Sequence, residues 1–211
     1  GRFGHSVIQG AAFSNTNGST WTGQVNFPGA SGFDKNLSAV DDVTGSTYFG
    51  RAYTVWTNFG GTFFNRIVIS FTTDGGTTWS TAAPVSPPQS PGHHHQGCDV
   101  RVGPGGVVHV VWANCTTNGQ NSTEDSLGYA RSTDGGVTWV FASNHVADMN
   151  GIRTSNLVNG IRCNGFPRLD IDKTGGPRNG WLYVVAGEKN FAPALDNSDV
   201  VLMRSNDNGA T

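Results

Sequence analysis

Charged residues are scarce in this chain. Lysine occurs only three times, Lys and Arg together number 13, Asp and Glu 15, and the formal net charge is −2. No cluster of basic residues could neutralise a row of phosphates, so we expect no nucleic-acid partner. Long apolar runs are also missing, because none approaches the ~18 residues of a membrane-spanning helix, and we expect no membrane insertion. The first residues, Gly1-Arg2-Phe3-Gly4-His5, do not read as a signal peptide, so we expect the chain to begin after any export signal.

Good helix formers are scarce as well. Gly, Thr, Asn and Ser account for 87 of the 211 residues, and these residues favour turns and strands over helices. Six Trp, four Tyr and twelve Phe supply enough apolar bulk to argue against intrinsic disorder. We therefore expect a globular, all-β protein with almost no helix.

One eight-residue phrase occurs four times. The copies are Ser14–Trp21, Thr72–Trp79, Ser132–Trp139 and, one residue shorter, Ser205–Thr211. An apolar, strand-like stretch precedes each of the last three copies, which predicts that the phrase is a turn between strands. Within it, Asp can accept backbone N–H bonds, Gly permits a positive φ, and the terminal Trp can pack against the sheet. The residues assigned this structural role are Asp74, Gly76, Trp79, Asp134, Gly136, Trp139, Asp207, Gly209 and Trp21.

A second repeated element lies between these turns. Arg51–Trp56, Val107–Trp112 and Trp181–Ala186 have the pattern of near-equivalent buried strands, and another strand and a turn precede each of them. Four strands per unit, with successive phrase tryptophans 58 and 60 positions apart, predict the four-stranded antiparallel blades of a β-propeller. We expect residues 1–30 to hold the outer part of one blade, 31–86 and 87–146 to form two blades, and 147–211 an incomplete one.

The phrase resembles a known family motif. Its S-x-D-x-G-x-T-W pattern is similar to the Asp-box, or BNR repeat, of sialidases and sialidase-like β-propellers. Phe166–Asp172 and Gly176–Val185 resemble linking strands of secreted bacterial BNR-repeat proteins, including surface proteins of Bacteroidetes. The resemblance implies a ring of about six to eight blades, of which about half is present, with the remaining blades supplied by the same polypeptide.

The resemblance also implies where a ligand would bind. In that family the Asp-boxes lie on the face opposite the ligand site, which leaves the loops at the other end of each blade. The charged and imidazole side chains singled out there are Arg153, Arg162, Arg168, Asp34, Asp148 and His94. A sialidase would need an arginine triad, a Tyr nucleophile activated by Glu, and a general acid. The family's F/Y-R-I-P arginine motif does not occur in this chain, and no spacing singles out an acid and base pair, so the catalytic residues stay unassigned.

Two further segments contain side chains that could bind a metal ion. His93-His94-His95 lies in a Pro-rich stretch, and it is interpreted either as a polar loop or as a contact for a transition metal or ligand. Asp196 and Asp199 could seat Ca²⁺ through oxygen ligands, or could belong to a capped turn that enters the next strand. No cofactor is otherwise expected.

The three cysteines, Cys98, Cys115 and Cys163, are not spaced as a zinc site, and the composition favours an extracellular protein. In a radial array of blades, Cys115 at the end of one strand and Cys163 before the next blade can come close, whereas Cys98 lies inside a strand. We expect a Cys115–Cys163 disulfide, with Cys98–Cys115 or three free thiols as alternatives.

The functional hypotheses span three classes. The leading one is a secreted or cell-surface, sialidase-like propeller that binds a glycan or a surface protein without doing chemistry. The second is an exo-sialidase or related glycoside hydrolase whose catalytic residues lie partly outside these 211 residues. The third is a structural spacer in a large adhesin or filament-associated protein.

Overall fold

The described part of the chain is built from strands. The computed structural model describes residues 9–28, 32–116, 123–153, 163–190, 192–193, 195 and 198–209. Within these ranges every regular element is a strand, except for two three-residue 3-10 turns, η1 (Gly61–Phe63) and η2 (Pro104–Gly106). These ranges contain no helix with the length and apolarity needed to cross a bilayer. The expectation of an all-β protein is confirmed.

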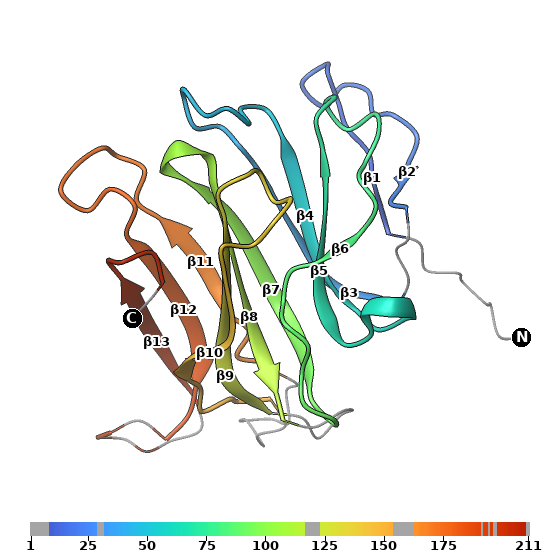
Figure 1. The fold of residues 1–211 in the computed structure, drawn as a ribbon. Helices are drawn as coiled ribbons and strands as arrows, with labels where there is room; N and C mark the ends of the chain where they lie inside the picture. Colours follow the sequence, from blue (N-terminus) through green and yellow to red (C-terminus); the bar gives the residue numbers. More distant parts are fainter. Residues whose placement is uncertain are drawn as a thin grey trace, which may run out of the picture.

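The described strands form four antiparallel sheets, and within each sheet every strand pairs with its neighbours along the chain (Figure 1). The N-terminal pair is β1 (Gly10–Ala11) and β2 (Val25–Asn26); the first sheet is β3 (Phe33–Val40), β4 (Ala52–Asn58), β5 (Arg66–Thr72) and β6 (Ala83–Pro84). The second sheet is β7 (His94–Gly103), β8 (Val107–Cys115), β9 (Glu124–Ser132) and β10 (Phe141–Asp148); the third is β11 (Arg168–Ile171), β12 (Leu182–Glu188) and β13 (Asp199–Ser205).

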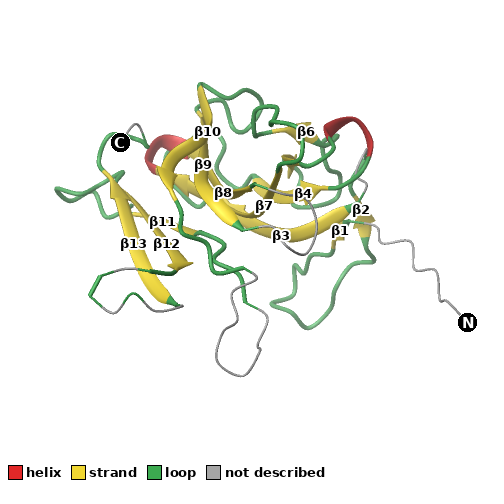
Figure 2. Ribbon diagram, turned by 90° about the horizontal axis from the view of Figure 1, so that it is seen from below, coloured by secondary structure: helices red, strands yellow, loops and turns green. Residues whose placement is uncertain are grey.

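The sheets pack on one another in chain order, with the N-terminal pair and the third sheet at opposite ends of the molecule (Figures 1 and 2). Separate apolar clusters fill the spaces between them. Tyr53 and Ile69 of the first sheet meet Val110 and Trp112 of the second. Val111 and Tyr129 of the second sheet meet Leu169 and Val184 of the third, and Phe27 beside the N-terminal pair packs with Trp56 of the first sheet.

The strand β8 shows why the middle of the array is apolar on both faces. Side chains alternate along a strand, so Val108, Val110 and Trp112 face the first sheet while Val111 and Ala113 face the third. All five are buried. The unbroken apolar run of β8 is therefore the sequence signal of a strand covered on both sides.

The repeated phrase forms the same turn each time. Ser132 Oγ accepts a hydrogen bond from Gly136 N at 2.9 Å, and Asp134 accepts from the backbone N of Thr138 at 2.9 Å and from its hydroxyl at 2.5 Å. Burial alone would raise the pKa of Asp134, but the hydrogen bonds from Thr138, Ser132 and Val137 together lower it to about 2. In the first copy Ser14 makes the equivalent bond to Gly18 N at 2.8 Å, but Thr16 stands where the other copies have Asp.

These turns also join neighbouring sheets. Arg51, at the start of β4, donates from Nη1 to the carbonyl oxygen of Gly135 at 2.6 Å. In the next interface the hydroxyl of Tyr129 donates to the carbonyl oxygen of Asn208 at 2.9 Å. The turns of the second and third sheets are thus each tied to the sheet before their own.

The terminal tryptophans of the phrase do not all behave alike. Trp79 packs with Phe27, with ring centroids 4.5 Å apart, and Trp139 packs against the core between the first and second sheets. Trp21, however, is 66% exposed, so the expectation that it packs against a sheet is wrong. The strands of the N-terminal pair are only two residues long, and they offer no sheet face for its indole.

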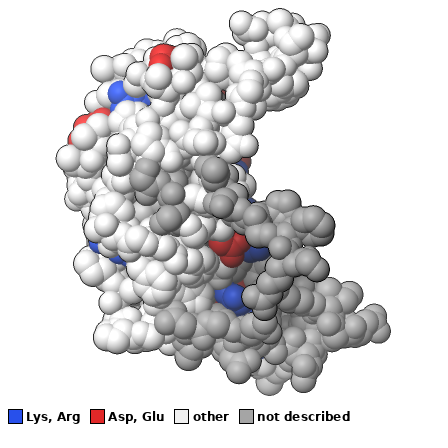
Figure 3. Space-filling model, turned by 90° about the vertical axis from the view of Figure 1, so that its right-hand side faces the viewer, with Lys and Arg blue, Asp and Glu red and all other residues white. Residues whose placement is uncertain are grey.

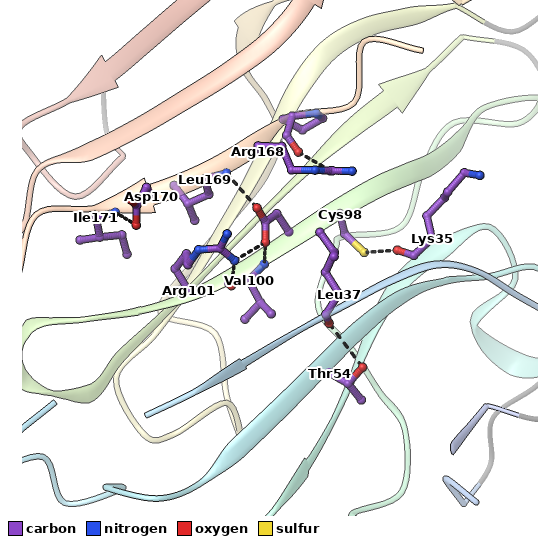
Figure 4. Close-up of polar contacts among 12 residues, drawn as sticks. Lys35, Leu37, Thr54, Cys98, Val100, Arg101, Arg168, Leu169, Asp170 and Ile171 are labelled. Atoms are coloured by element: carbon purple, nitrogen blue, oxygen red, sulfur yellow. Dashed lines mark hydrogen bonds and ion pairs between the residues drawn. The ribbon is translucent and has the colours of Figure 1, made fainter. Parts of the chain in front are cut away.

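A buried carboxylate links the second and third sheets at their adjoining first strands (Figure 4). Asp99 of β7 accepts from Leu169 N of β11 at 3.0 Å, and also from Val100 N at 2.8 Å and Arg101 Nη1 at 2.6 Å. Burial raises the pKa of Asp99, although these donors favour its charged form. The geometry fixes β11 beside β7, where the candidate site lies.

Replacing Asp134 with Ala is expected to lower the free energy of unfolding by about 1–3 kcal/mol, because the turn N–H groups lose their acceptor. Denaturant melts of the 211-residue chain measure this loss. Asp134→Asn keeps one acceptor oxygen and should cost less. Equal stability of Asp134→Ala and the parent chain would show that these bonds do not stabilise the turn.

Candidate functional site

A polar cleft lies at the end of the sheets opposite the repeated turns. In the first sheet Asp34 pairs with Thr57 and Asn58 pairs with Arg66, whereas the turn Thr72–Trp79 follows the other end of β5. The cleft has a volume of about 210 Å³ and is lined by Lys35, Gln96, Arg153, Cys163, Asn164 and Phe166. The side on which the family resemblance predicts a ligand therefore contains a concave, polar surface.

A chain of hydrogen bonds crosses the cleft. Arg153 donates from Nη1 to Oε1 of Gln96, and Gln96 donates from Nε2 to Oδ2 of Asp34. Asp34 in turn lies 3.7 Å from the ammonium group of Lys35, and His94 Nε2 lies 3.3 Å from the same Gln96 oxygen. The structure thus brings three of the predicted residues, Arg153, Asp34 and His94, together around a glutamine that the sequence did not single out.

Buried glutamates hold the segment that carries Arg153. Both carboxylate oxygens of Glu124 accept backbone bonds, one from Arg153 N at 3.1 Å and the other from Gly165 N at 2.8 Å. Glu188 accepts from Asn150 N at 2.8 Å. The guanidinium carbon of Arg153 also lies 5.9 Å from the centre of the Phe166 ring. Arg153 is therefore fixed through its backbone and its side chain before any ligand arrives.

Two β-bulges shape the walls of the cleft. The β3–β4 register shifts between Asp34 and Leu37, where Lys35 has a positive φ of 54°. The β7–β8 register shifts between Gln96 and Asp99, where Gly97 has a φ of 67°. Bulges redirect side chains, and they are common beside binding sites. They explain how Lys35 and Gln96 enter the cleft from strands whose regular alternation would not place them there.

The arrangement supplies donors and acceptors for a polar ligand. Arg153, Lys35 and Asn164 offer N–H groups, Asn164 and Gln96 carry amide oxygens, and Phe166 supplies an apolar ring. Glycoside hydrolysis by the usual routes needs two carboxyl groups flanking one bond. Of the nearby carboxylates described, Asp34 is bound to Gln96 and Glu124 is occupied by backbone N–H groups. Both of these carboxylates are therefore already engaged by other groups of the chain.

A second hollow, of about 290 Å³, lies among the first strands of the three sheets. Both of its cations are already paired: Lys173 donates to Asp42 at 2.7 Å, and Arg101 donates to the buried Asp99 at 2.6 Å. The Lys173–Asp42 pair joins the turn after β11 to the turn after β3 across the second sheet. We therefore regard this hollow as structural.

The remaining ligand-side candidates lie away from the cleft or outside the described residues. Asp148 ends the outer strand β10, is exposed, and pairs with His145 at 2.8 Å. Arg168 begins β11, is exposed, and donates to the carbonyl oxygen of Pro167 at 2.8 Å. Arg162 lies outside the described residues. Asp148 pairs with Ser126 and so lies at the end of its sheet opposite the repeated turn, but it is on the outer strand and does not line the cleft.

The three consecutive histidines do not form a loop, which corrects the sequence interpretation. Strand β7 begins at His94, so the side chains of His94 and His95 point to opposite faces. His95 is fully buried, and its Nδ1 lies 2.7 Å from Ser86 Oγ. Burial, with smaller contributions from Arg66, His94 and His93, lowers the pKa of His95 to about 3. His95 is therefore a neutral core residue, and His94 alone of the two faces the cleft network.

The described residues give no support for a metal centre or for the expected disulfide. They contain no group of three His, Cys, Asp or Glu side chains able to hold a metal ion. Asp199 pairs with Glu188 in the β12–β13 ladder, and Asp196 lies outside the described residues. Cys98, Cys115 and Cys163 are all free thiols, so the expected Cys115–Cys163 bridge is not formed. Burial raises the pKa of Cys115 to about 12, consistent with a buried thiol inside the core.

Surface charge agrees with the low charge content of the sequence. On the face shown in Figure 3, Lys and Arg atoms are few, and most lie next to Asp and Glu atoms. The described part of that face shows no broad basic area. This leaves the polar cleft as the strongest candidate binding site among the described residues.

Comparisons with known proteins found structural likeness only. No protein-family model and no curated protein matches the chain. The chain is similar to the intramolecular trans-sialidase from Ruminococcus gnavus, solved with oseltamivir carboxylate: 14% identity, TM-score 0.46, covering 90% of this chain and 38% of that chain. It is also similar to the NanB sialidase from Streptococcus pneumoniae: 17% identity, TM-score 0.45, covering 90% and 27%.

A third similar structure is an exo-β-1,3-galactanase from Clostridium thermocellum, with 11% identity, a TM-score of 0.29, and coverage of 82% of this chain and 46% of that chain. The chain thus spans less than half of the length of each of these three enzymes. Because every TM-score is below 0.5, the likeness supports no conclusion about activity, and the function proposed below depends on the residues of the cleft.

Proposed function

We propose that this chain is a glycan-binding module, secreted or displayed at a cell surface, that holds a sugar in the cleft around Arg153 and Gln96. The observation that carries the proposal is the buried guanidinium of Arg153, which lies beside the Phe166 ring and donates to Gln96 at the wall of a polar cleft. Sugars present hydroxyl groups that both donate and accept, together with apolar C–H faces. A planar charged donor, amide groups and an aromatic ring match those two properties.

A sugar is favoured over a surface protein by the shape of the site. The cleft is a small concavity of about 210 Å³ that lies between β3, β7 and the segment before β11. Stable protein interfaces are much broader, at about 800 Å² on each partner, and are centred on apolar anchors. The extracellular location is supported by the Ser-, Thr- and Asn-rich, Lys-poor composition. A purely structural spacer would have no need of a buried, pre-oriented arginine.

Binding should depend on Arg153 and not on a neighbouring arginine outside the cleft. Arg153→Met keeps the aliphatic stem near Phe166 but removes the guanidinium. We expect it to weaken glycan binding by about tenfold to a hundredfold, because a hydrogen bond to a charged group contributes about 1.5–3 kcal/mol. A glycan array identifies the sugar, and calorimetric titration of the 211-residue chain measures the affinity.

The matched control is Arg168→Met, which removes an exposed guanidinium that bonds only a local carbonyl. It should leave the affinity unchanged. Absence of binding to any glycan by the folded chain would contradict the proposal and favour the spacer. Release of free sugar from a glycoside during the titration would instead favour the hydrolase.

A further inference from the structure

Both cations that line the polar cleft are connected to a carboxylate. The ammonium group of Lys35 lies 3.7 Å from Oδ1 of Asp34. Arg153 reaches the other oxygen of Asp34 through Gln96, which accepts from the guanidinium with its amide oxygen and donates to the carboxylate with its amide nitrogen. A single carboxylate is thus connected to Lys35 directly and to Arg153 through one neutral side chain.

A second carboxylate lies next to the same site. Glu124 is only 1% exposed, and its two oxygens accept from the backbone N of Arg153 and of Gly165. Its charge acts on neighbouring groups, because after burial it is the largest cause that raises the pKa of the Cys115 thiol. The nearby Arg168 is exposed to solvent and does not line the cleft. Among the described residues the cleft therefore combines two cations with two carboxylates, whose formal charges cancel.

This balance of charge is unfavourable for an acidic ligand. An anion that leaves water for a protein site is stable only when the site supplies a charge that is not already offset. A ligand carboxylate in this cleft would find both cations already connected to Asp34. It would also approach the negative charge of Asp34 itself, whose side chain is 36% exposed. The added anion would therefore lose hydration without gaining an unpaired partner.

The remaining polar groups of the lining suit a ligand without charge. Gln96 and Asn164 carry amides, and Phe166 supplies an aromatic ring. Amides have both donors and acceptors, as the hydroxyl groups of a sugar do. A hydroxyl group can form hydrogen bonds with these side chains and with Arg153 while the link between Lys35 and Asp34 stays intact.

We propose, on the basis of the glycan-binding function stated above, that the cleft selects an uncharged sugar and discriminates against the corresponding acidic sugar. The selection arises from Asp34, which offsets the charge of Lys35 and repels a second carboxylate. The sugar that binds is therefore a neutral hexose unit, and its hydroxyl groups, not a carboxylate, contact Arg153.

A glycan array with matched pairs tests this selection. Galactose-, glucose- and mannose-terminated glycans are each placed beside the uronic acid form, which differs only by a carboxylate in place of the primary alcohol. The 211-residue chain should bind at least one neutral member. Calorimetric titration of the strongest pair should give an affinity at least about tenfold higher for the neutral sugar, which corresponds to about 1.4 kcal/mol.

Salt dependence provides a second measurement that needs no variant. The affinity for the neutral sugar should be the same at about 50 mM and about 500 mM NaCl, because salt screens interactions between charges and the ligand carries none. An affinity that falls as salt is added would show that the cleft attracts a charged ligand.

Asp34→Asn tests which charge is responsible. The variant removes the negative charge but keeps an oxygen that can accept from Gln96. It should raise the affinity for the uronic acid relative to the neutral sugar by about tenfold. The matched control is Asp148→Asn, which removes an exposed carboxylate on the outer strand β10 and should leave this ratio unchanged. Melting curves establish that both variants are folded.

A preference for the acidic sugar would overturn the selection and leave the glycan-binding function standing, as would an unchanged ratio in folded Asp34→Asn. If Asp34→Asn does not fold, the matched pairs and the salt dependence of the parent chain still decide the question. Absence of binding to every glycan of the array would contradict the glycan-binding function itself, and the selection with it.

Discussion

Lowering the pH from 7 to 5 is expected to reduce the free energy of unfolding by about 4 kcal/mol, because two core histidines stay neutral in the folded chain. His95 packs with Trp112, and His109 donates from Nδ1 to the hydroxyl of Tyr129 at 2.8 Å. Burial lowers the pKa of both, to about 3, with smaller contributions from Arg66 for His95 and Arg131 for His109.

The loss of stability at lower pH follows from the difference in proton binding between the unfolded and the folded chain. Below its unperturbed pKa of about 6.5, each histidine takes up a proton in the unfolded chain but not in the folded one. Each therefore removes about 1.4 kcal/mol of stability per pH unit between pH 6.5 and its folded pKa. Asp74 and Asp134, whose pKa values hydrogen bonding lowers to about 2, lose their contribution only below about pH 4. The raised pKa of Asp99 acts in the opposite sense.

Urea melts at pH 7, 6 and 5 measure this dependence. The control is the double variant His95→Asn/His109→Gln, which lacks both titrating groups. Its free energy of unfolding should depend less steeply on pH between pH 5 and 7. Equal stability of the parent chain at pH 5 and pH 7 would mean that both histidines can be protonated without cost in the folded state.

Gly97→Ala is expected to destabilise the chain by about 2–5 kcal/mol and to abolish glycan binding, because Gly97 holds the wall of the cleft. Its φ is 67°, and an added Cβ would lie only 2.0 Å from Cγ of Phe166. The new methyl group must therefore displace the ring that lies beside Arg153. The left-handed conformation adds a further cost of about 1–2 kcal/mol for any residue with a Cβ.

Gly105→Ala is the matched control. Gly105 has a φ of 73°, and an added Cβ would meet nothing within 4 Å, so only the conformational cost should appear. Phe166→Gly combined with Gly97→Ala should remove the clash, because both Cγ and Cβ of Phe166 lie within 2.4 Å of the added Cβ, so the two costs should not add. Urea melts give the stabilities, and calorimetric titration gives the binding. Equal costs for Gly97→Ala and Gly105→Ala would show that Phe166 adapts freely and does not shape the cleft.

The repeats predicted the fold class well because each repeat is a local pattern. An apolar stretch followed by an Asp- and Gly-containing phrase specifies a strand and its turn without reference to distant residues, and the structure has strands and turns at these places. Trp21 shows the limit of this reasoning. It has the same local phrase as Trp79, but it is exposed because burial depends on what the rest of the chain packs beneath it.

The candidate site was only partly predictable from the sequence, because β-bulges, which interrupt the regular alternation of a strand, shape its walls. Arg153, Asp34 and His94 were singled out as charged or titratable residues, but Gln96 and Lys35 enter the cleft through bulges that simple alternation does not predict. Gly97 lies inside a strand pattern, and a glycine in that position could have indicated the bulge in β7. The Cys115–Cys163 bridge was wrongly expected because the packing of one sheet on the next, and not spacing along the chain, decides which strand ends meet.

Pairing of each strand only with its neighbours in the chain bears on how the protein is made. The first sheet is complete once residues up to Pro84 have left the ribosome, and it can form before the second exists. Until β8 emerges, however, the face that carries Tyr53 and Ile69 has no cover. During synthesis, the most recently formed sheet would therefore expose an apolar face until the next sheet packs on it. The order of translation would set the order in which these faces are buried.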